Sequence, residues 1–232
     1  MKVSVVIPAY NEEKFITKTI ESIKALSFQP DEILIIDGGS TDKTKAVAEG
    51  LGARVVTVPH RGIGFARQCG LEKAIGDIIA FTDADSVVPK EWLRKIVDAL
   101  SKQGVSCVFS EFWVPDGWLP YRFFINVLQP IYIPLFHYLF GISLAPGQNT
   151  AFWRKKAVEA GGYPVDFKIA EDLEMAKRLS KVGKVVYLFD NFVVSSGRRG
   201  DEGLPLIRRV FMAYWYYATT KRADKIGFPD IR

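Results

Sequence analysis

The sequence has few cysteines and lacks a recognisable secretion signal. Cys69 and Cys107 lie far apart, without a Cys-x-x-Cys motif or a His-rich neighbourhood, which argues against a disulfide framework and a zinc site. Residues 2–7 are already strand-like, and no basic segment, apolar stretch and cleavage site occur in succession. We therefore expect a cytoplasmic location. The inner face of the membrane is the alternative location.

Two common phosphate-binding loops are also missing. No Gly-x-Gly-x-x-Gly follows the first apolar run, and no Gly-x-x-x-x-Gly-Lys-Ser/Thr occurs in the chain. These absences argue against dinucleotide-binding and P-loop proteins. No repeat, low-complexity segment or linker interrupts the 232 residues, so we expect one globular domain over 1–232.

The charge balance is basic. A formal net charge of +5 and a pI near 9.1 suit an anionic partner, such as a nucleic acid, a phosphorylated substrate or an acidic membrane face. The Lys and Arg residues are dispersed and form no recognisable nucleic-acid-binding motif, so we expect no nucleic-acid partner.

The first half alternates short apolar runs with amphipathic stretches. The runs are continuously apolar, which is typical of parallel strands buried on both faces; they cover residues 3–7, 32–36, 54–58 and 78–81. Asn11 is a candidate N-cap for the first helix, with Glu12 and Glu13 in its first turn. The alternation predicts a three-layer α/β/α sandwich with a mostly parallel central sheet.

The second half has a different composition. Residues 112–145 are rich in aromatics and prolines, 171–182 form a helix pattern, 184–189 a strand pattern, and 206–221 a basic, aromatic helix pattern. We therefore divide the domain into segments 1–110, 111–204 and 205–232.

Acidic residues follow the strand patterns where ligands of open α/β sheets lie. Asp83 and Asp85 follow the fourth run, and carboxylates two apart on an extended segment point the same way. Such a pair suits Mg²⁺ or Mn²⁺, although an ordinary loop is the alternative.

Asp37 precedes two glycines and could accept hydrogen bonds from a nucleoside, or cap the next helix. Glu171 and Asp172 lie at the start of a predicted helix. They could stabilise the helix N-terminus, or one of them could act as a base that removes a proton from an acceptor hydroxyl.

These motifs together resemble the family 2 glycosyltransferases with the GT-A fold. Segments matching that family's motifs occur in order over roughly 3–190: Val-Ser-Val-Val-Ile-Pro-Ala-Tyr-Asn-Glu-Glu (3–13), Ile-Asp-Gly-Gly-Ser-Thr-Asp (36–42), Gly-x-x-x-Ala-Arg (62–67), Thr-Asp-Ala-Asp (82–85) and Glu-Asp (171–172). The resemblance implies an inverting enzyme that moves one sugar from a nucleotide-diphosphate sugar to a carbohydrate or lipid-linked acceptor. It further implies that 1–110 binds the donor and 111–204 the acceptor.

The resemblance also assigns roles to residues. It implies that Asp85, with Asp83, ligates a divalent cation and that Asp172 is the catalytic base with Glu171 beside it. The residues implied to hold the donor are Pro8, Ala9, Tyr10, Glu12, Asp37, Gly38, Arg67, Asp83 and Ala84. We expect the acceptor or the diphosphate to contact Gln148, Asn149, Trp153, Arg198 and Arg199.

Several alternatives stay open. Arg67 could add charge stabilisation or form a structural salt bridge, and Arg198 and Arg199 could hold an anion or pair with Asp201 and Glu202. The Gln-x-x-Arg-Trp motif of processive members is absent, which favours single-sugar addition. The rival functions are a nucleotidyltransferase and a non-catalytic sugar-nucleotide or membrane-surface binding protein.

Membrane association is a further open alternative. Residues 123–145 are long enough to span a bilayer, but polar residues and prolines interrupt them, so an interfacial element is favoured over a true span. This segment and the basic, aromatic C-terminal helix could dock on an anionic leaflet. The same aromatics could instead complete the core or a dimer interface.

Overall fold

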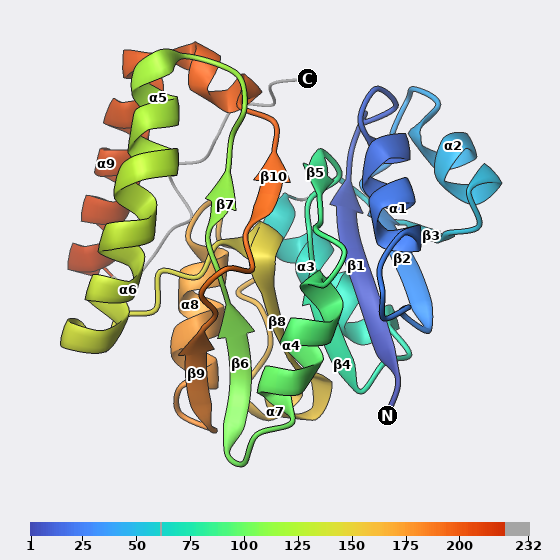
Figure 1. Cartoon of the computed structure of the whole chain (residues 1–232). Helices are drawn as coiled ribbons and strands as arrows, with labels where there is room; N and C mark the ends of the chain where they lie inside the picture. The colour runs from blue at the N-terminus through green and yellow to red at the C-terminus, as the bar shows by residue number, and fades with distance from the viewer. Residues whose placement is uncertain (61, 221–232) are drawn as a thin grey trace.

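A seven-stranded sheet forms the centre of the molecule (Figure 1). A computed structural model describes residues 1–60 and 62–220; the last part of the predicted C-terminal segment, 221–232, lies outside the described residues. The strand order is β3-β2-β1-β4-β8-β6-β9. These strands are β1 (Val3–Ala9), β2 (Glu32–Asp37), β3 (Arg54–Thr57), β4 (Ile78–Phe81), β6 (Val105–Phe109), β8 (Thr150–Trp153) and β9 (Lys184–Tyr187).

Most neighbouring strands of this sheet run parallel. The pairs β1–β2, β1–β4, β2–β3 and β6–β9 are parallel, whereas β8 runs antiparallel to both β4 and β6. The predicted mostly parallel sheet is therefore confirmed. The four predicted runs of the first half all form strands, and their ends differ from the prediction by at most two residues.

Helices cover both faces of the sheet because alternate strand residues point to opposite sides. In β1, Val5 and Ile7 pack into one apolar cluster, and Val6 packs into another. The first cluster includes side chains of α1 (Ile16–Lys24), α2 (Thr44–Gly50) and α4 (Trp92–Leu100). The second includes side chains of α3 (Ile63–Lys73), α7 (Arg154–Glu159) and α8 (Glu171–Leu179). The three-layer prediction is confirmed.

Asn11 does not cap the first helix, so that prediction is wrong. Helix α1 begins at Ile16 and is preceded by Phe15, which leaves Glu12 and Glu13 outside its first turn. Asn11 has a φ of 55° and its Oδ1 accepts a hydrogen bond of 2.8 Å from the Thr41 backbone N–H. Because asparagine tolerates the left-handed conformation, it can tie the loops after β1 and β2 together.

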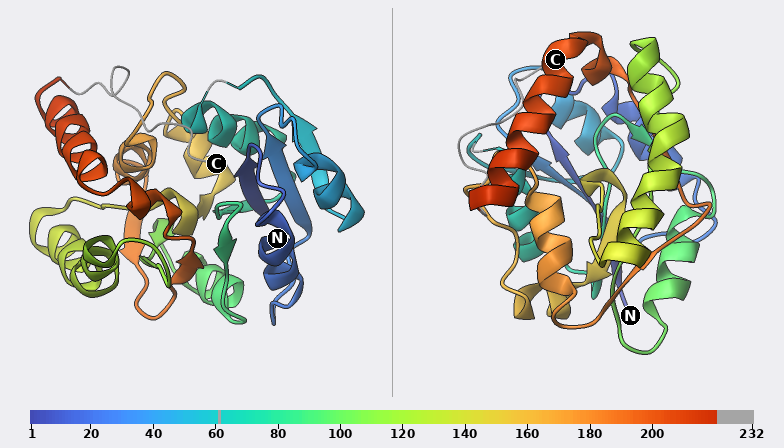
Figure 2. Two further views of the ribbon diagram at one scale, coloured as in Figure 1. Left: turned by 90° about the horizontal axis from the view of Figure 1, so that it is seen from above. Right: turned by 90° about the vertical axis from the view of Figure 1, so that its left-hand side faces the viewer.

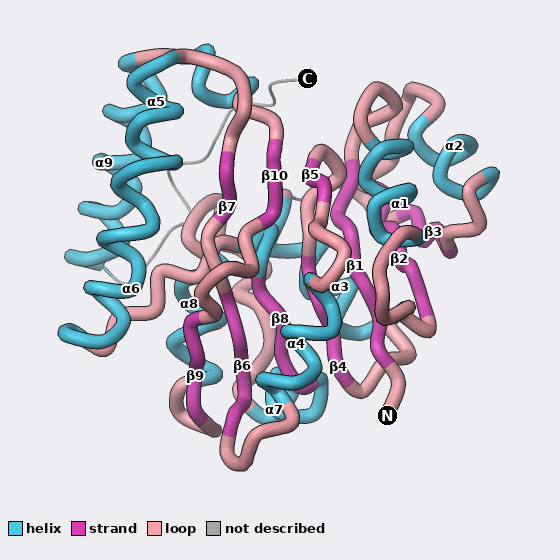
Figure 3. The backbone as a smooth tube through the Cα atoms, in the orientation of Figure 1, coloured by secondary structure: helices cyan, strands magenta, loops and turns pink. Residues whose placement is uncertain are grey.

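A small second sheet lies beside the carboxyl end of β4. Its order is β5-β10-β7, with strands β5 (Ser86–Val87), β7 (Phe112–Trp113) and β10 (Val193–Ser195) (Figure 3). The Ser86 and Ser195 hydroxyls lie 2.7 Å apart, and the Ser196 N–H donates to the Asp85 carbonyl at 3.2 Å. The sheet thereby holds the segment after β10 against the Asp-x-Asp loop.

The aromatic, proline-rich segment of the second half is largely helical. It forms α5 (Leu119–Phe123), a π-helical turn η1 (Phe124–Leu128) and α6 (Gln129–Phe140), followed by a 3₁₀ turn η2 (Gly147–Asn149). After β10 come a second 3₁₀ turn, η3 (Arg198–Glu202), and α9 (Leu204–Thr220). Both α5–α6 and α9 lie on one flank of the molecule, at the left in Figure 1.

Candidate active site

The loops after β1, β2 and β4 meet at one edge of the central sheet. Ala9 pairs with Asp37 and Val6 pairs with Phe81, so the carboxyl ends of these parallel strands are adjacent. Tyr10, Asp37 and Asp83 follow or close these strands. The structure thus brings the predicted residues of the first half together at one edge.

A guanidinium bridges two of the predicted carboxylates. Arg198 Nη2 donates to Glu12 Oε1 at 2.7 Å and lies 3.0 Å from Asp85 Oδ2. The ring of Phe15 lies beneath the same guanidinium, 4.6 Å from its central carbon. Arg198 therefore pairs with carboxylates of the Asp-x-Asp and β1 loops, whereas Glu202, one of its predicted partners, pairs with Arg209.

The charge around Asp85 favours a cation. Burial raises the pKa of Asp85 to about 6, with Asp83 and Glu12 adding to the rise and Arg198 opposing it. Carboxylate oxygens of this kind are the ligands that Mg²⁺ and Mn²⁺ prefer, so the residues present fit a divalent cation. Within 1–60 and 62–220, no group of three or more His, Cys, Asp or Glu side chains could enclose a metal ion. A cation here would need further oxygens from a ligand.

Asp37 is 1% exposed and is held within its own loop. Its Oδ1 accepts hydrogen bonds from the Ser40 hydroxyl and, at 3.2 Å, from the Ser40 N–H. The Ser40 hydroxyl oxygen in turn accepts the Asn11 N–H at 2.8 Å. Asp37 thus shapes the loop beside Gly38, and its role toward a nucleoside stays a prediction.

His60 is a site residue that the sequence did not point out. Its ring lies 4.1 Å from the Tyr10 ring, centroid to centroid, with 34° between their planes. A Cβ atom on Gly38 would lie 3.2 Å from His60 Nδ1, so the absence of a side chain at Gly38 leaves space beside the His60 ring. A lone histidine after a strand carries no motif, and only the fold places it beside Tyr10.

Arg67 is fully buried and links the two halves of the site. Its guanidinium donates to Glu171 and lies 3.3 Å from Asp83 Oδ1. The charges of Glu171 and Asp83 raise the pKa of Arg67 against the effect of burial. A Cβ atom on Gly147 would lie 2.0 Å from Arg67 Nη1, so only glycine leaves room there. Of the two alternatives for Arg67, the structure shows the salt bridge.

Glu171 and Asp172 begin α8, immediately after a strained residue. Ala170 has φ 60° and ψ 20°, the left-handed conformation that costs a non-glycine residue about 1–2 kcal/mol. Asp172 Oδ2 accepts the Gly147 N–H at 2.9 Å, and Oδ1 accepts the Leu173 N–H at 2.8 Å. Burial raises the pKa of Asp172, while Arg67 and the backbone donors oppose the rise. Asp172 is half-buried, whereas Glu171 is buried against Arg67.

Two predicted acceptor residues are placed elsewhere. Asn149 is 2% exposed and uses its amide internally: Oδ1 accepts Trp92 Nε1–H at 2.9 Å, and Nδ2 donates to the Glu111 and Asn191 carbonyls. Trp153 pairs with Ile78 at the opposite end of β4. The ligand role predicted for both residues is therefore wrong. Gln148 and Arg199 remain beside the site, in η2 and η3.

The glycosyl transferase family 2 profile matches residues 4–158. The chain belongs to this family. The matched stretch includes Tyr10, Asp37, Arg67, Asp83 and Asp85, and ends before Glu171.

Relatives of known activity and structure agree with this assignment. A glucosyl-dolichyl phosphate glucuronosyltransferase from Haloferax volcanii is 28% identical over 183 residues, which are 70% of this chain and 56% of that protein. The glucosyl-3-phosphoglycerate synthase of Mycobacterium tuberculosis, solved with Mn²⁺, UDP and glucosyl-3-phosphoglycerate, has a TM-score of 0.64 and 28% identity, covering 93% of this chain and 78% of that one. A Pyrobaculum calidifontis mannosyltransferase, solved with GDP-Man and Mn²⁺, has a TM-score of 0.73 and 23% identity, covering 95% and 64%.

These neighbours establish the GT-A fold for this chain. The chain spans about half the length of the curated relatives it matches. Two of the solved neighbours thus hold Mn²⁺ together with UDP or GDP-Man.

Proposed function

We propose that the chain transfers a single sugar from a nucleoside-diphosphate sugar to an acceptor, with inversion at the anomeric carbon and with a divalent cation. The observation that supports this most directly is that Arg67 joins Asp83 to Glu171, the neighbour of Asp172. Asp85 lies within electrostatic reach of Asp83 and pairs with Arg198. A carboxylate predicted to bind the donor and one predicted to lie beside the base thus share Arg67 as a partner.

Asp83 and Asp85 are the residues proposed to hold the cation. When bound, a divalent cation supplies Lewis-acid neutralisation of the charge that develops on the departing diphosphate. The Mn²⁺ in the mycobacterial complex supports this assignment, since that enzyme is 28% identical to this chain. Tyr10 and His60 offer an aromatic platform for the base, and Gly38 leaves room beside it.

Asp172 is the proposed base for the acceptor hydroxyl. A carboxylate whose pKa lies above the ordinary range takes up a proton more readily than a free aspartate, and burial supplies that rise here. The backbone N–H groups of Gly147 and Leu173 fix its two oxygens. Glu171 is buried beside Asp172 and pairs with Arg67, so we assign it the role of holding that guanidinium in place.

The donor is tested first by binding. Thermal-shift measurements with UDP, GDP, ADP and CDP, each with and without Mn²⁺, should show a metal-dependent rise in Tm for the matching nucleotide, because a ligand at about 100 times its Kd stabilises a protein by about 2.7 kcal/mol. Transfer from the corresponding sugar nucleotides follows, with the anomeric configuration of the product read by NMR. Failure of all four nucleotides to raise Tm with Mn²⁺ contradicts the proposal.

The base is tested by Asp172→Asn, with Asp166→Asn on an exposed neighbouring loop as the matched control. Loss of general-base catalysis should lower kcat about 10²–10⁴-fold with the donor Kd unchanged. The control should keep wild-type turnover. Near-normal transfer by the Asn variant would remove Asp172 from the mechanism and would point to an acceptor that is already an anion.

A further inference from the structure

Large apolar side chains are exposed on two helical segments far apart in the sequence. Within the described residues, most exposed large apolar side chains belong to these segments. In the first they are Leu119, Phe123, Phe124, Val127, Leu128, Ile131, Leu135, Phe136, Tyr138, Leu139, Phe140 and Ile142, and in the second Leu204, Ile207, Phe211, Met212 and Trp215. We call these residues the apolar flank. So many large apolar side chains exposed on one flank indicate an interaction site.

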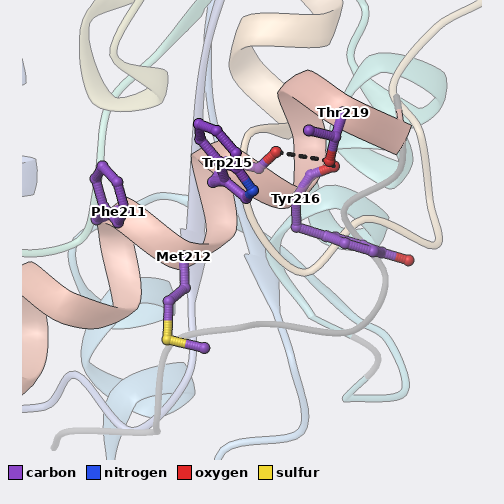
Figure 4. Close-up of a pocket in the computed structure, with 5 residues that line it drawn as sticks. All are labelled: Phe211, Met212, Trp215, Tyr216 and Thr219. Carbon is purple, nitrogen blue, oxygen red and sulfur yellow. Dashed lines mark hydrogen bonds between the residues drawn. The ribbon is translucent and has the colours of Figure 1, made fainter.

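Both segments lie on the same side of the molecule. In the two views of Figure 2, α5–α6 and α9 occupy one flank and approach each other at the end where η3 lies. On α9, Phe211, Met212 and Trp215 border a shallow hollow that opens outward, with Tyr216 and Thr219 completing its rim (Figure 4). The Phe211 and Trp215 rings stack at 6.3 Å on the exposed side of the helix.

The charged residues on the two helices that carry the apolar flank are all basic. No Asp or Glu occurs from residue 117 to 158 or from residue 203 to 223. The basic residues in the two helices are Arg122, Arg208 and Arg209, of which Arg208 is exposed. Arg209 already pairs with Glu202. In a symmetric dimer the same patch would face itself and would bring no carboxylate from these two helices to the exposed Arg208. An anionic lipid surface offers both the apolar layer and the counter-charge.

The helical run Leu119–Phe140 is long enough to cross a bilayer. It has 22 residues, only 17% of its most apolar stretch is buried, and 22 residues of helix extend about 33 Å. Its inner face, however, is fastened to the domain. Ile125 and Ile133 are buried, and the Gln129 side chain accepts the Phe112 N–H at 3.1 Å. Asn126 exchanges two hydrogen bonds with the Val114 backbone.

We propose that the apolar flank docks this protein on an anionic lipid bilayer, with α5–α6 and α9 lying in the headgroup layer. Crossing the bilayer would break the polar ties of Asn126 and Gln129, whereas lying in the surface keeps them. The flank adjoins the site, because a Cβ atom on Gly200 would lie 2.3 Å from the Tyr121 ring of α5. Gly200 shares the short turn η3 with Arg198, so docking would place the site beside the lipid surface.

Vesicle flotation tests the proposal without reference to turnover. The full chain should float with vesicles of phosphatidylcholine and phosphatidylglycerol at low salt, and several-fold less at high salt, because salt screens the arginines. The double variant Ile131→Glu/Leu135→Glu should bind at least about tenfold more weakly, since each replaced side chain would otherwise bury apolar area. The matched control, Ile75→Glu/Val158→Glu, changes two exposed apolar residues outside the flank and should bind as the wild type does.

Two further measurements distinguish a lipid surface from a second copy of the chain as the partner of the apolar flank. Brominated lipids should quench wild-type tryptophan fluorescence, and Trp215→Phe should remove most of that quenching. Light scattering should give a monomer without vesicles. Wild-type protein that stays at the bottom of the low-salt gradient, or flank and control variants that float equally well, would overturn the proposal. A dimer that the flank variant alone dissociates would assign the face to a second copy of the chain.

Discussion

Arg198 Nη2 and Asp85 Oδ2, 113 residues apart in sequence, lie 3.0 Å from each other. The same nitrogen donates to Glu12, and the Phe15 ring supports the guanidinium from below. A positive side chain therefore contacts Asp85, one of the two carboxylates proposed to bind a divalent cation. Cation binding at Asp85 must displace this guanidinium or share the carboxylate with it.

Removing this guanidinium should strengthen the binding of Mn²⁺ alone. Charge-assisted hydrogen bonds contribute about 1.5–3 kcal/mol, so Arg198→Ala should lower the Mn²⁺ Kd about tenfold, as read by electron paramagnetic resonance of free Mn²⁺ without nucleotide. Arg94→Ala is the control, because Arg94 also contacts two carboxylates, Glu91 and Asp98, on the surface. Weaker Mn²⁺ binding by the Arg198 variant would show that the arginine supports the cation instead of competing with it.

The aromatic platform predicts a loss of nucleotide affinity in Tyr10→Ala. Stacking of a base on an aromatic side chain is worth about 1–3 kcal/mol, so the Kd for the matching nucleoside diphosphate should rise about tenfold or more in calorimetry. His60→Ala should show a smaller effect in the same direction. Phe189→Ala, at an exposed ring in contact with Tyr138 and Tyr187, is the control. Unchanged affinity in the Tyr10 variant would place the base elsewhere.

Two glycine substitutions should have opposite effects on stability. Gly147→Ala would drive a methyl group into the Arg67 guanidinium and should lower the free energy of unfolding by about 1–3 kcal/mol. Gly50→Ala adds a methyl group in helix α2 with no atom within 4 Å and should raise it by about 0.4–1 kcal/mol. Urea unfolding measures both. A neutral Gly147→Ala would mean that Arg67 can leave its place without cost.

The cluster around Arg67 predicts a pH dependence of stability. Burial raises the pKa of Glu171 from 4.5 to about 7, and the neighbouring carboxylate of Asp172 adds to the rise. A raised pKa means that the folded state holds the proton more tightly, so this stabilisation is complete below about pH 4.5 and is lost as the pH rises through about 7. Its size is on the order of 3 kcal/mol, because each unit of difference between the folded and unfolded pKa corresponds to about 1.36 kcal/mol.

The neutral variant Glu171→Gln should flatten that dependence. Urea unfolding between pH 5 and 8 should show a smaller fall in stability for Glu171→Gln than for the wild type. Glu159→Gln, in an exposed ion pair with Lys156, should keep the wild-type slope. Equal slopes in all three proteins would show that Glu171 stays ionised across this range.

Much of the fold could be predicted because its signals are local. The run 78–81 is continuously apolar and forms a fully buried strand with the predicted bounds. Asp83 and Asp85 follow it directly, so their place at the edge of the sheet depends only on recognising that strand. The helix start at Glu171 was likewise predictable from its acidic first turn.

The features that were missed depend on long-range pairing. Strand β8 inserts antiparallel between β4 and β6, which no pattern within 150–153 indicates. The contact of Glu12 with Arg198 joins residues 186 apart. Asn149, predicted to contact the acceptor or the diphosphate, instead uses its buried amide to bind Trp92 and two backbone carbonyls. Only the assembled core reveals that use.

The left-handed conformation of Ala170 matters for engineering this protein. Glycine would adopt the same φ of 60° without a steric penalty, so Ala170→Gly relieves the local clash. It also frees the peptide that aims Asp172, because glycine can adopt many other conformations. A screen that selects for folding stability alone would favour this substitution. The selected protein would hold the Asp172 carboxylate less firmly in its present orientation.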